Sequence, residues 1–254
     1  MFEPFVIFIR KVLAGFGLEV RRLCIEPDIY HRRGARLLQY ATERKVNVLL
    51  DIGANQGQYA AAFHDVGFTG RTISFEPVAE SFATLQPRAA GRQDWDARQV
   101  ALGDTDANAT IQIGGNRECS SLLPMNERLV AAYPVAASCG EQPVRVCRLD
   151  SLRAELFKDT DRFFMKLDVQ GYELKVLHGA RRTLPRVELI DIELTLVPLY
   201  DSQPLFIEVL QFLDEEGFVP VSFENGFSDA NTGHALQIDV IFLRKPPVAR
   251  RPTR

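Results

Sequence analysis

Short apolar runs alternate with amphipathic segments along most of this chain. Five runs are typical of buried strands: residues 46–51, 71–75, 95–102, 163–167 and 187–194. Segments whose apolar positions follow helical spacing lie between or after them: residues 59–66, 78–89, 172–183 and 205–216. Strands that alternate with helices predict an α/β fold built on a mainly parallel sheet.

Two further strands are predicted towards the C-terminal end, at residues 218–223 and 237–243, with no helix between them. A loop rich in glycine, asparagine and aspartate joins them, which favours an antiparallel strand at the edge of the sheet. The stretch from Asp104 to Asp150 is the least regular part of the chain. We interpret it as an insertion near the active site.

The segment before the first strand has helical character. One helical face collects the apolar residues Phe5, Phe8, Ile9, Val12, Leu13 and Phe16, and a second helix is expected from about Asp28 to Arg44. We therefore divide the chain into an N-terminal helical extension (1–45), an α/β domain (46–245) and a basic tail (246–254) that we expect to be disordered.

Composition narrows the class of protein. A length of 254 residues suits one globular domain, and a net charge of −3 argues against a nucleic-acid partner for the chain as a whole. The four cysteines lack the spacing of a zinc site, and no secretory signal is evident, so we expect a cytoplasmic protein with reduced thiols. No apolar run is long enough to cross a membrane.

The loop after the first strand is the place to look for a ligand, because open α/β sheets bind ligands beyond the carboxyl ends of their strands. It reads Asp51-Ile-Gly-Ala-Asn-Gln-Gly57. Gly53 and Gly57 allow a close approach of the backbone to a ligand, but Asn55 replaces the second glycine of the dinucleotide fingerprint. Asp51 disfavours a pyrophosphate and favours a cationic or hydroxyl-bearing ligand.

Glu76 follows the second strand, one strand–helix–strand step after Asp51. A carboxylate at this place can accept two hydrogen bonds from a ribose diol. The alternative is that both acids only cap helices. Their occurrence at successive strand ends, together with the glycine spacing, favours an adenosine-type cofactor such as S-adenosylmethionine (SAM), which carries both an ammonium and a sulfonium group.

Four strings of the sequence carry a resemblance to a known family: DIGANQGQYA, SFEP, VALGD and KLDVQGYELKVLHGA. The chain resembles the FkbM-type methyltransferases, class I SAM-dependent enzymes that mostly methylate hydroxyl oxygens. The resemblance runs from about Val46 to Arg244. It implies a Rossmann-like, seven-stranded sheet with helices on both faces and a reversed last strand. Some segments also resemble members that act on sugars of glycolipids.

The resemblance also implies a set of cofactor-binding residues. The methionine end of SAM would be held by Asp51, Gly53, Asn55 and Gly57, and the ribose by Glu76. Ala101 and Leu102, after the third strand, would border the adenine.

Three residues are candidates for catalysis. Asp168 ends the fourth strand and is our first choice for the general base, although it could instead cap a helix or face the cofactor. Glu193, near the end of the fifth strand, could share a Mg²⁺ ion with Asp168, or could simply pair with Lys166 or an arginine. His234, in the loop before the last strand, could reach the acceptor as a base.

These observations predict a SAM-dependent O-methyltransferase that acts on a hydroxyl, of a sugar on a glycolipid or a secondary metabolite. The alternatives are methylation of a polyketide or another small molecule, and a non-catalytic subunit that binds SAM or sugar. The apolar face of the N-terminal helix, next to Arg10 and Lys11, is compatible with peripheral contact to an anionic membrane, with packing on the sheet, or with a homodimer contact.

Overall fold

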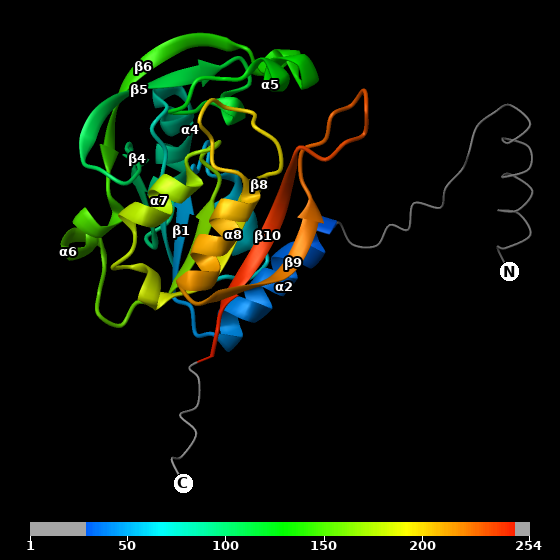
Figure 1. Ribbon diagram of the computed structural model, residues 1–254. Helices are drawn as coiled ribbons and strands as arrows, with labels where there is room; N and C mark the ends of the chain where they lie inside the picture. Colours follow the sequence, from blue (N-terminus) through cyan, green and yellow to red (C-terminus); the bar gives the residue numbers. More distant parts are fainter. Residues whose placement is uncertain (1–28, 247–254) are drawn as a thin grey trace, which may run out of the picture.

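A computed structural model describes residues 29–246 of the protein, and the side chains from Arg33 onwards (Figure 1). The predicted helix from Phe5 to Phe16 and nearly all of the basic tail lie outside the described residues. The second predicted helix is present as α2 (Ile29–Glu43). No helix in the described part of the chain is long and apolar enough to cross a membrane.

The predicted seven-stranded sheet is confirmed. Its strands, in spatial order, are β3 (Trp95–Arg98), β2 (Arg71–Phe75), β1 (Val48–Ile52), β7 (Phe163–Leu167), β8 (Val187–Thr195), β10 (Gln237–Arg244) and β9 (Phe218–Asn225). The first five pair in parallel, whereas β10 runs antiparallel to both of its neighbours. The carboxyl ends of the parallel strands therefore meet at one edge of the sheet.

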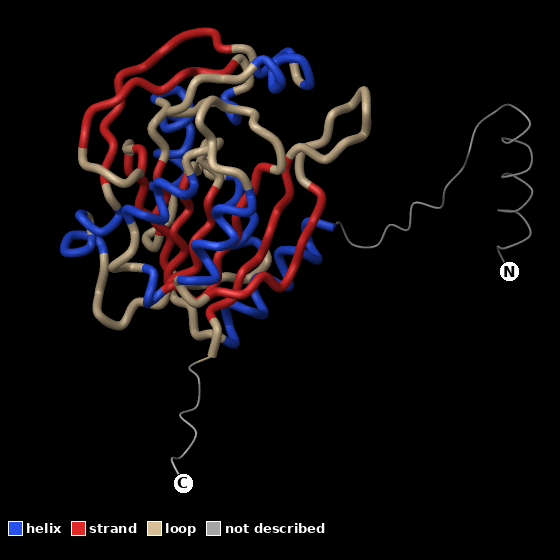
Figure 2. Tube along the Cα trace, in the orientation of Figure 1, coloured by secondary structure: helices blue, strands red, loops and turns tan. Residues whose placement is uncertain are grey.

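Helices cover both faces of the sheet, as the resemblance implied (Figure 2). On one face pack α2, α3 (Gln58–Asp65) and α4 (Ala79–Ala90), and on the other α7 (Glu173–Gly179) and α8 (Phe206–Glu215). In β1, Leu49 faces the first group of helices, while Val48, Leu50 and Ile52 face the second. A strand that is buried on both faces reads as a continuous apolar run, which explains why these strands were visible in the sequence.

The predicted strand over 95–102 is wrong in its extent. The chain turns at residue 99, where the N–H groups of Val100 and Glu76 both donate to the carbonyl of Arg98. Only β3 belongs to the main sheet. Ala101 and Leu102 form β4, which joins a second sheet of three strands in the order β4-β6-β5.

The stretch from Asp104 to Asp150 is more regular than its sequence suggests. It contains β5 (Ala107–Gly114) and β6 (Ser138–Cys147), which pair as an antiparallel hairpin, and the short helix α5 (Glu127–Ala132). Figure 1 shows these elements, in green, above one end of the main sheet. Most residues of the hairpin are exposed or half-buried, so its strands lack the apolar pattern that marks the others.

Candidate active site

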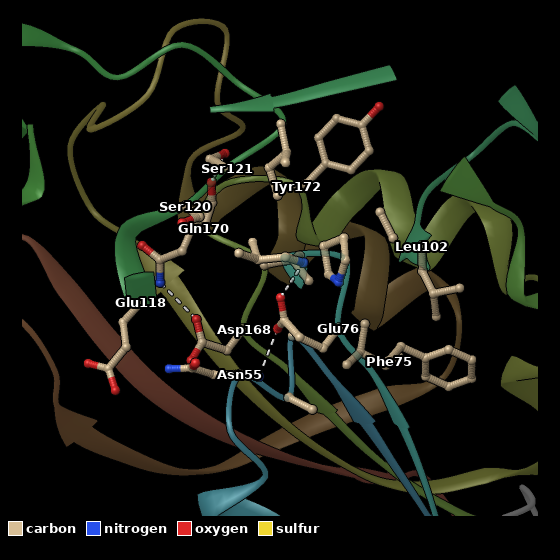
Figure 3. Close-up of a pocket in the computed structure, with 18 of the residues that line it drawn as sticks. Asn55, Phe75, Glu76, Leu102, Glu118, Ser120, Ser121, Asp168, Gln170 and Tyr172 are labelled. Carbon is tan, nitrogen blue, oxygen red and sulfur yellow. Dashed lines mark hydrogen bonds between the residues drawn. The ribbon is translucent and has the colours of Figure 1, made fainter. Parts of the chain in front are cut away.

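A cavity of about 500 Å³ opens at the carboxyl ends of the parallel strands (Figure 3). Its wall combines the loop after β1, the ends of β2, β7 and β8, the strand β4, and a segment of residues 117–122 that follows the β5 strand. The stretch that we interpreted as an insertion thus contributes side chains to the same cavity as the predicted cofactor loop.

Gly53 sits where the loop after β1 touches the end of β7. Its φ is +74°, and a Cβ atom at this position would lie 1.8 Å from the carbonyl oxygen of Asp168. The N–H groups of Gly53 and Ala54 both donate to the carbonyl of Phe75, at 3.0 Å. Only glycine can bring this loop so close to the neighbouring strand, and the contact fixes the floor of the cavity.

Asn55 and Glu76 are joined on the cavity wall. The N–H of Asn55, which has a φ of +47°, donates to Oε2 of Glu76 at 2.8 Å. The side-chain Oδ1 of Asn55 is buried and has no hydrogen-bond partner among the residues that the structure describes. A buried acceptor without a donor is costly, so this atom fits a ligand that brings an N–H or O–H group.

Glu76 is almost fully buried, and backbone groups hold both of its oxygens. Oε1 accepts from the N–H of Val78 at 2.7 Å, and Oε2 accepts from Asn55 (Figure 3). Burial raises the pKa of Glu76 to about 7, although the two backbone hydrogen bonds lower it. Each oxygen keeps a free lone pair, so the carboxyl can still accept hydrogen bonds from a diol.

Ala101 and Leu102 lie on the apolar side of the same cavity. Both are buried and line it together with Phe75 and Tyr172. This part of the wall can take a flat, weakly polar group, as expected for a site that borders adenine.

The structure does not bring Asp51 and Gly57 to the cavity wall. Asp51 is fully buried behind it and accepts a hydrogen bond from the hydroxyl of Ser74 at 3.1 Å. Gly57, with a φ of +77°, begins helix α3, and a Cβ atom there would lie 2.7 Å from Leu85 and 3.0 Å from Trp95. Both residues support the loop on its side away from the cavity.

Lys166 is a cation that lies beneath the glycine loop. Its Nζ donates to the carbonyl of Gly53 at 2.8 Å and lies 3.7 Å from Oδ1 of Asp51 and 3.6 Å from Oδ2 of Asp168. Burial opposes its charge, but the carboxylates of Asp168 and Asp51 outweigh burial and raise the pKa of Lys166 above its ordinary value. Lys166 therefore stays charged beneath the glycine loop.

Asp168 and Glu193 come together, because β7 and β8 are neighbours. A single amide bridges them: Nε2 of Gln170 donates to Oδ1 of Asp168 at 2.7 Å and to Oε2 of Glu193 at 3.0 Å. Burial, and then the charges of Asp168 and Asp239, raise the pKa of Glu193 well above its ordinary value. Asp168 is half exposed to the cavity and stands beside Lys166. Two carboxyl groups, joined by one amide, thus face the same space.

His234 lies elsewhere. It is exposed, in the loop between β9 and β10, and does not line the cavity. Within residues 29–246, no group of three His, Cys, Asp or Glu side chains is arranged to hold a metal ion.

Sequence reasoning missed several polar residues of the cavity wall, among them Gln170, Asp239 and Tyr59. Asp239 lies in β10 directly opposite Glu193, and a single acid inside an apolar strand was the available signal. The hydroxyl of Tyr59 donates to Asp191 at 2.6 Å, on the same face of β8 as Glu193. Tyr59 falls within a predicted helix, where an aromatic residue is indistinguishable from ordinary core.

Comparison with known proteins identifies the family of this chain. Residues 51–220, about two thirds of the chain, match the family model of the methyltransferase FkbM domain. The chain is also 25% identical over 218 residues to the 2-O-methyltransferase NoeI of Sinorhizobium fredii, and this match covers 83% of the chain and 87% of that protein.

Solved structures with a related arrangement are more distant. A methyltransferase FkbM from Methylobacillus flagellatus is 15% identical with a TM-score of 0.43, over 77% of this chain and only 43% of the other. The 1,6-didemethyltoxoflavin-N1-methyltransferase of Burkholderia thailandensis, with bound S-adenosylhomocysteine, is 12% identical with a TM-score of 0.45, over 96% and 90%. The fold is defined by the order and direction of its own strands.

Proposed function

The chain belongs to the FkbM methyltransferase family, and from this membership we propose that it is a SAM-dependent O-methyltransferase. We propose as its acceptor a hydroxyl group of a sugar, on a glycolipid or a secondary metabolite. The similarity to a 2-O-methyltransferase supports oxygen as the methylated atom. When bound, SAM would supply a methyl group that its sulfonium has already activated.

The pairing of Asn55 with Glu76 is the observation that carries the cofactor assignment. The unpartnered Oδ1 of Asn55 would accept a hydrogen bond from the ammonium group of SAM, and the free lone pairs of Glu76 would accept from its ribose. Phe75 and Leu102 offer apolar surface to the adenine. These residues fit the three chemically different parts of the cofactor.

The other end of the cavity suits an acceptor with hydroxyl groups. Hydrogen-bond acceptors dominate there, namely the carboxyl groups of Glu118, Asp168, Glu193 and Asp239. A hydroxyl is a weak nucleophile, and a positioned base contributes about 10²–10⁴-fold to the rate. Asp168, which is partly exposed and stands beside Lys166, would accept the proton that the acceptor hydroxyl releases.

Calorimetry tests the cofactor. We expect the protein to bind SAM, and Glu76→Ala to weaken binding by about 1–3 kcal/mol, the cost of unpaired polar groups in a buried site. NAD is the control ligand, because it shares the adenosine but adds a pyrophosphate next to the loop. Equal affinity for NAD and SAM, or an unchanged affinity in the variant, would contradict the assignment.

Labelled SAM identifies the acceptor. Incubation of the protein with radiolabelled SAM and fractionated cell extract should label a product whose methyl group is attached to oxygen. A labelled sugar supports the proposal, and a labelled polyketide favours the second substrate class. SAM binding without any labelled product points to a non-catalytic subunit.

A role for Mg²⁺ is tested by chelation. The two candidate ligands, Asp168 and Glu193, are bridged by the amide of Gln170, so a cation between them would have to displace an N–H donor. We therefore expect methyl transfer to survive EDTA. Loss of activity that Mg²⁺ restores would assign a metal to this pair.

A lipid-linked acceptor would require access to a membrane surface. The apolar positions between Phe5 and Phe16, next to Arg10 and Lys11, lead us to propose peripheral contact there. Flotation with anionic liposomes compares the full chain with a chain that begins at Leu18. If the full chain stays in the soluble fraction at low salt, this proposal fails; a change of oligomeric state in the shorter chain alone would favour a homodimer contact.

A further inference from the structure

Gln170 occupies a strained position between β7 and α7. Its φ is +52°, which is uncommon for a residue other than glycine, and Gly171 follows with a φ of +96°. The carbonyl oxygen of Gln170 accepts a hydrogen bond of 2.6 Å from the hydroxyl of Ser121, on the segment after β5. Strained residues of this kind persist only where the surroundings hold them, and they concentrate at functional sites.

Both donors and the acceptor of the Gln170 side chain have hydrogen-bond partners. A primary amide has two N–H donors, and here one reaches Asp168 and the other Glu193 (Figure 3 shows the bond to Asp168). Its Oε1 lies 2.9 Å from the hydroxyl of Tyr200, which is fully buried. Burial raises the pKa of Tyr200, so its phenol keeps its hydrogen and remains a donor, shared with the carbonyl of Cys119 at 3.0 Å.

This arrangement fixes one oxygen of each carboxyl group and leaves the other available. Gln170 binds Oδ1 of Asp168, while Oδ2 lies 3.6 Å from Lys166. In Glu193, Oε2 accepts from Gln170 and also from Nε2 of Gln237 at 2.6 Å. The amide therefore separates two acids that would otherwise repel each other, and orients both towards the cavity.

We propose that Gln170 is a positioning residue that holds Asp168 and Glu193 as one proton-accepting pair for the acceptor hydroxyl. This role rests on the proposed function. In the reaction, the acceptor hydroxyl transfers its proton to Asp168, one oxygen of which Gln170 holds in place. Gln170 touches neither reactant and acts only through the two carboxyl groups.

The effect of the amide on titration follows from electrostatics. Other titratable or charged groups surround the pair: Lys166, Glu173, Asp239, Cys119 and Glu118. Arg33 of α2 lies 3.3 Å from Asp239. Around the pair, acidic groups outnumber cationic ones. Because the N–H groups of Gln170 stabilise the ionised carboxyls, their loss makes the pair harder to ionise, and titration moves to higher pH.

Three variants separate the contributions of the individual hydrogen bonds to the titration of the carboxyl pair. Gln170→Leu removes both donors. Tyr200→Phe removes only the hydroxyl that holds Oε1, and Gln237→Leu removes the donor that reaches Glu193 alone. Gln112→Leu is the matched control, since it removes a 2.8 Å amide–carboxylate bond to Glu141 on the exposed β5–β6 hairpin.

The test is NMR titration of the protein with ¹³C-labelled aspartate and glutamate side chains, with signals assigned through Asp168→Asn and Glu193→Gln. We expect Gln170→Leu to move the midpoint of Glu193 up by about one pH unit, because Glu193 loses a hydrogen bond that favours its ionised form. Tyr200→Phe should give a smaller shift of the same sign, Gln237→Leu a shift of Glu193 mainly, and Gln112→Leu no shift. An unchanged midpoint of Glu193 in Gln170→Leu, or in folded Tyr200→Phe if the first variant does not fold, overturns the proposal.

SAM binding by the same variants distinguishes this inference from the proposed function. The titration needs neither cofactor nor acceptor, and Gln170→Leu should bind SAM with wild-type affinity. Methyl transfer into the acceptor-containing extract fraction should fall by about 10-fold or more in this variant, with its pH profile displaced to higher pH. A wild-type protein that does not bind SAM refutes the proposed function, whereas normal binding with an undisplaced pH profile refutes only the role of Gln170.

Discussion

The ammonium group of Lys166 lies 3.7 Å from Oδ1 of Asp51, beneath the glycine loop that borders the cavity. Asp51 is fully buried, and its other oxygen accepts from Ser74, which in turn accepts from the indole N–H of Trp95 at 3.0 Å. Burial raises the pKa of Asp51, and the charge of Lys166 is the largest effect that opposes this rise. The carboxylate at the end of β1 therefore depends on Lys166 for its charge.

Lys166→Met should destabilise the protein. Removing one member of a buried ion pair leaves the other without compensation, which typically costs about 3–5 kcal/mol. Urea unfolding near neutral pH would measure this loss. The double variant Lys166→Met with Asp51→Asn should recover part of it, because it removes both charges. A single variant as stable as the wild type would show that Asp51 does not rely on Lys166.

Glu76 should make the unfolding free energy depend on pH. Burial raises its folded-state pKa from 4.5 to about 7, so its contribution to stability is present below about pH 4.5 and is lost as the pH rises through 7. We expect the stability advantage of the wild type over Glu76→Gln to shrink by about 2–3 kcal/mol between about pH 5 and about pH 8. Urea unfolding of both proteins at the two pH values provides the measurement.

Glu173 has a similarly raised pKa, again through burial first, but it is present in both proteins and cancels in the comparison. An advantage that stays constant with pH would mean that Glu76 is ionised over the whole range in the folded state.

The parts of the fold that the sequence predicts are those in which burial leaves a pattern. In β1, each of the five residues is buried, and the run of apolar side chains marks the strand. In β6, by contrast, Ser138, Gly140 and Gln142 are held in a strand by pairing with β5. Because that pairing is a contact between distant residues, no local pattern reveals it, and the hairpin was read as irregular.

The residues of the candidate site also fall into those that the sequence reveals and those that it does not. The sequence places Asp168 and Glu193 at the ends of successive strands, and they come together because these strands are neighbours in the parallel sheet. No local pattern marks Gln170, because its role follows from a positive φ and from contacts to Tyr200 and Ser121. His234 illustrates the opposite error, since a loop position near the last strand does not determine which way the loop runs.

Gly53→Ala should damage both the fold and the site. The new Cβ atom would lie 1.8 Å from the carbonyl oxygen of Asp168, and the φ of +74° would be strained for alanine. A strain of this kind costs about 1–3 kcal/mol, and relief of the clash must displace the end of β7. Gly140→Ala is the control, because nothing lies within 4 Å of its Cβ position.

We expect thermal unfolding to show a clear loss for Gly53→Ala and almost none for Gly140→Ala. SAM affinity, measured by calorimetry, should fall in the first variant only. Equal stability of the two variants would indicate that the loop can move away from β7 at little cost.

Arg33 links helix α2 to the sheet through three carboxylates, one of which, that of Asp239, lines the cavity. Its guanidinium binds Asp191 on β8, lies 3.0 Å from Glu224 on β9 and 3.3 Å from Asp239 on β10. Burial raises the pKa of Asp239 to about 6, and Arg33 is the strongest effect in the opposite direction. Loss of Arg33 would leave two neighbouring acids without their cation, the buried Asp191 and the half-buried Asp239. It would also remove the partner that fixes Asp191 for its hydrogen bond with Tyr59.

Arg33→Met should therefore lower the unfolding free energy by about 3–5 kcal/mol, as expected for a broken buried ion pair. The matched control is Arg36→Met, one helical turn later. Arg36 is exposed, and its side-chain partners among the residues that the structure describes are Ser222 and Glu224, so its loss should cost about 0–1 kcal/mol. The penalty for Arg33→Met should grow as the pH rises through 6 and above, because Asp239 must then carry its charge without this partner. Urea unfolding of both variants at acidic and alkaline pH measures the difference. If the two arginines cost the same, or if the penalty for Arg33→Met is independent of pH, helix α2 is held to the sheet by its apolar face alone, and the three carboxylates do not need a cation.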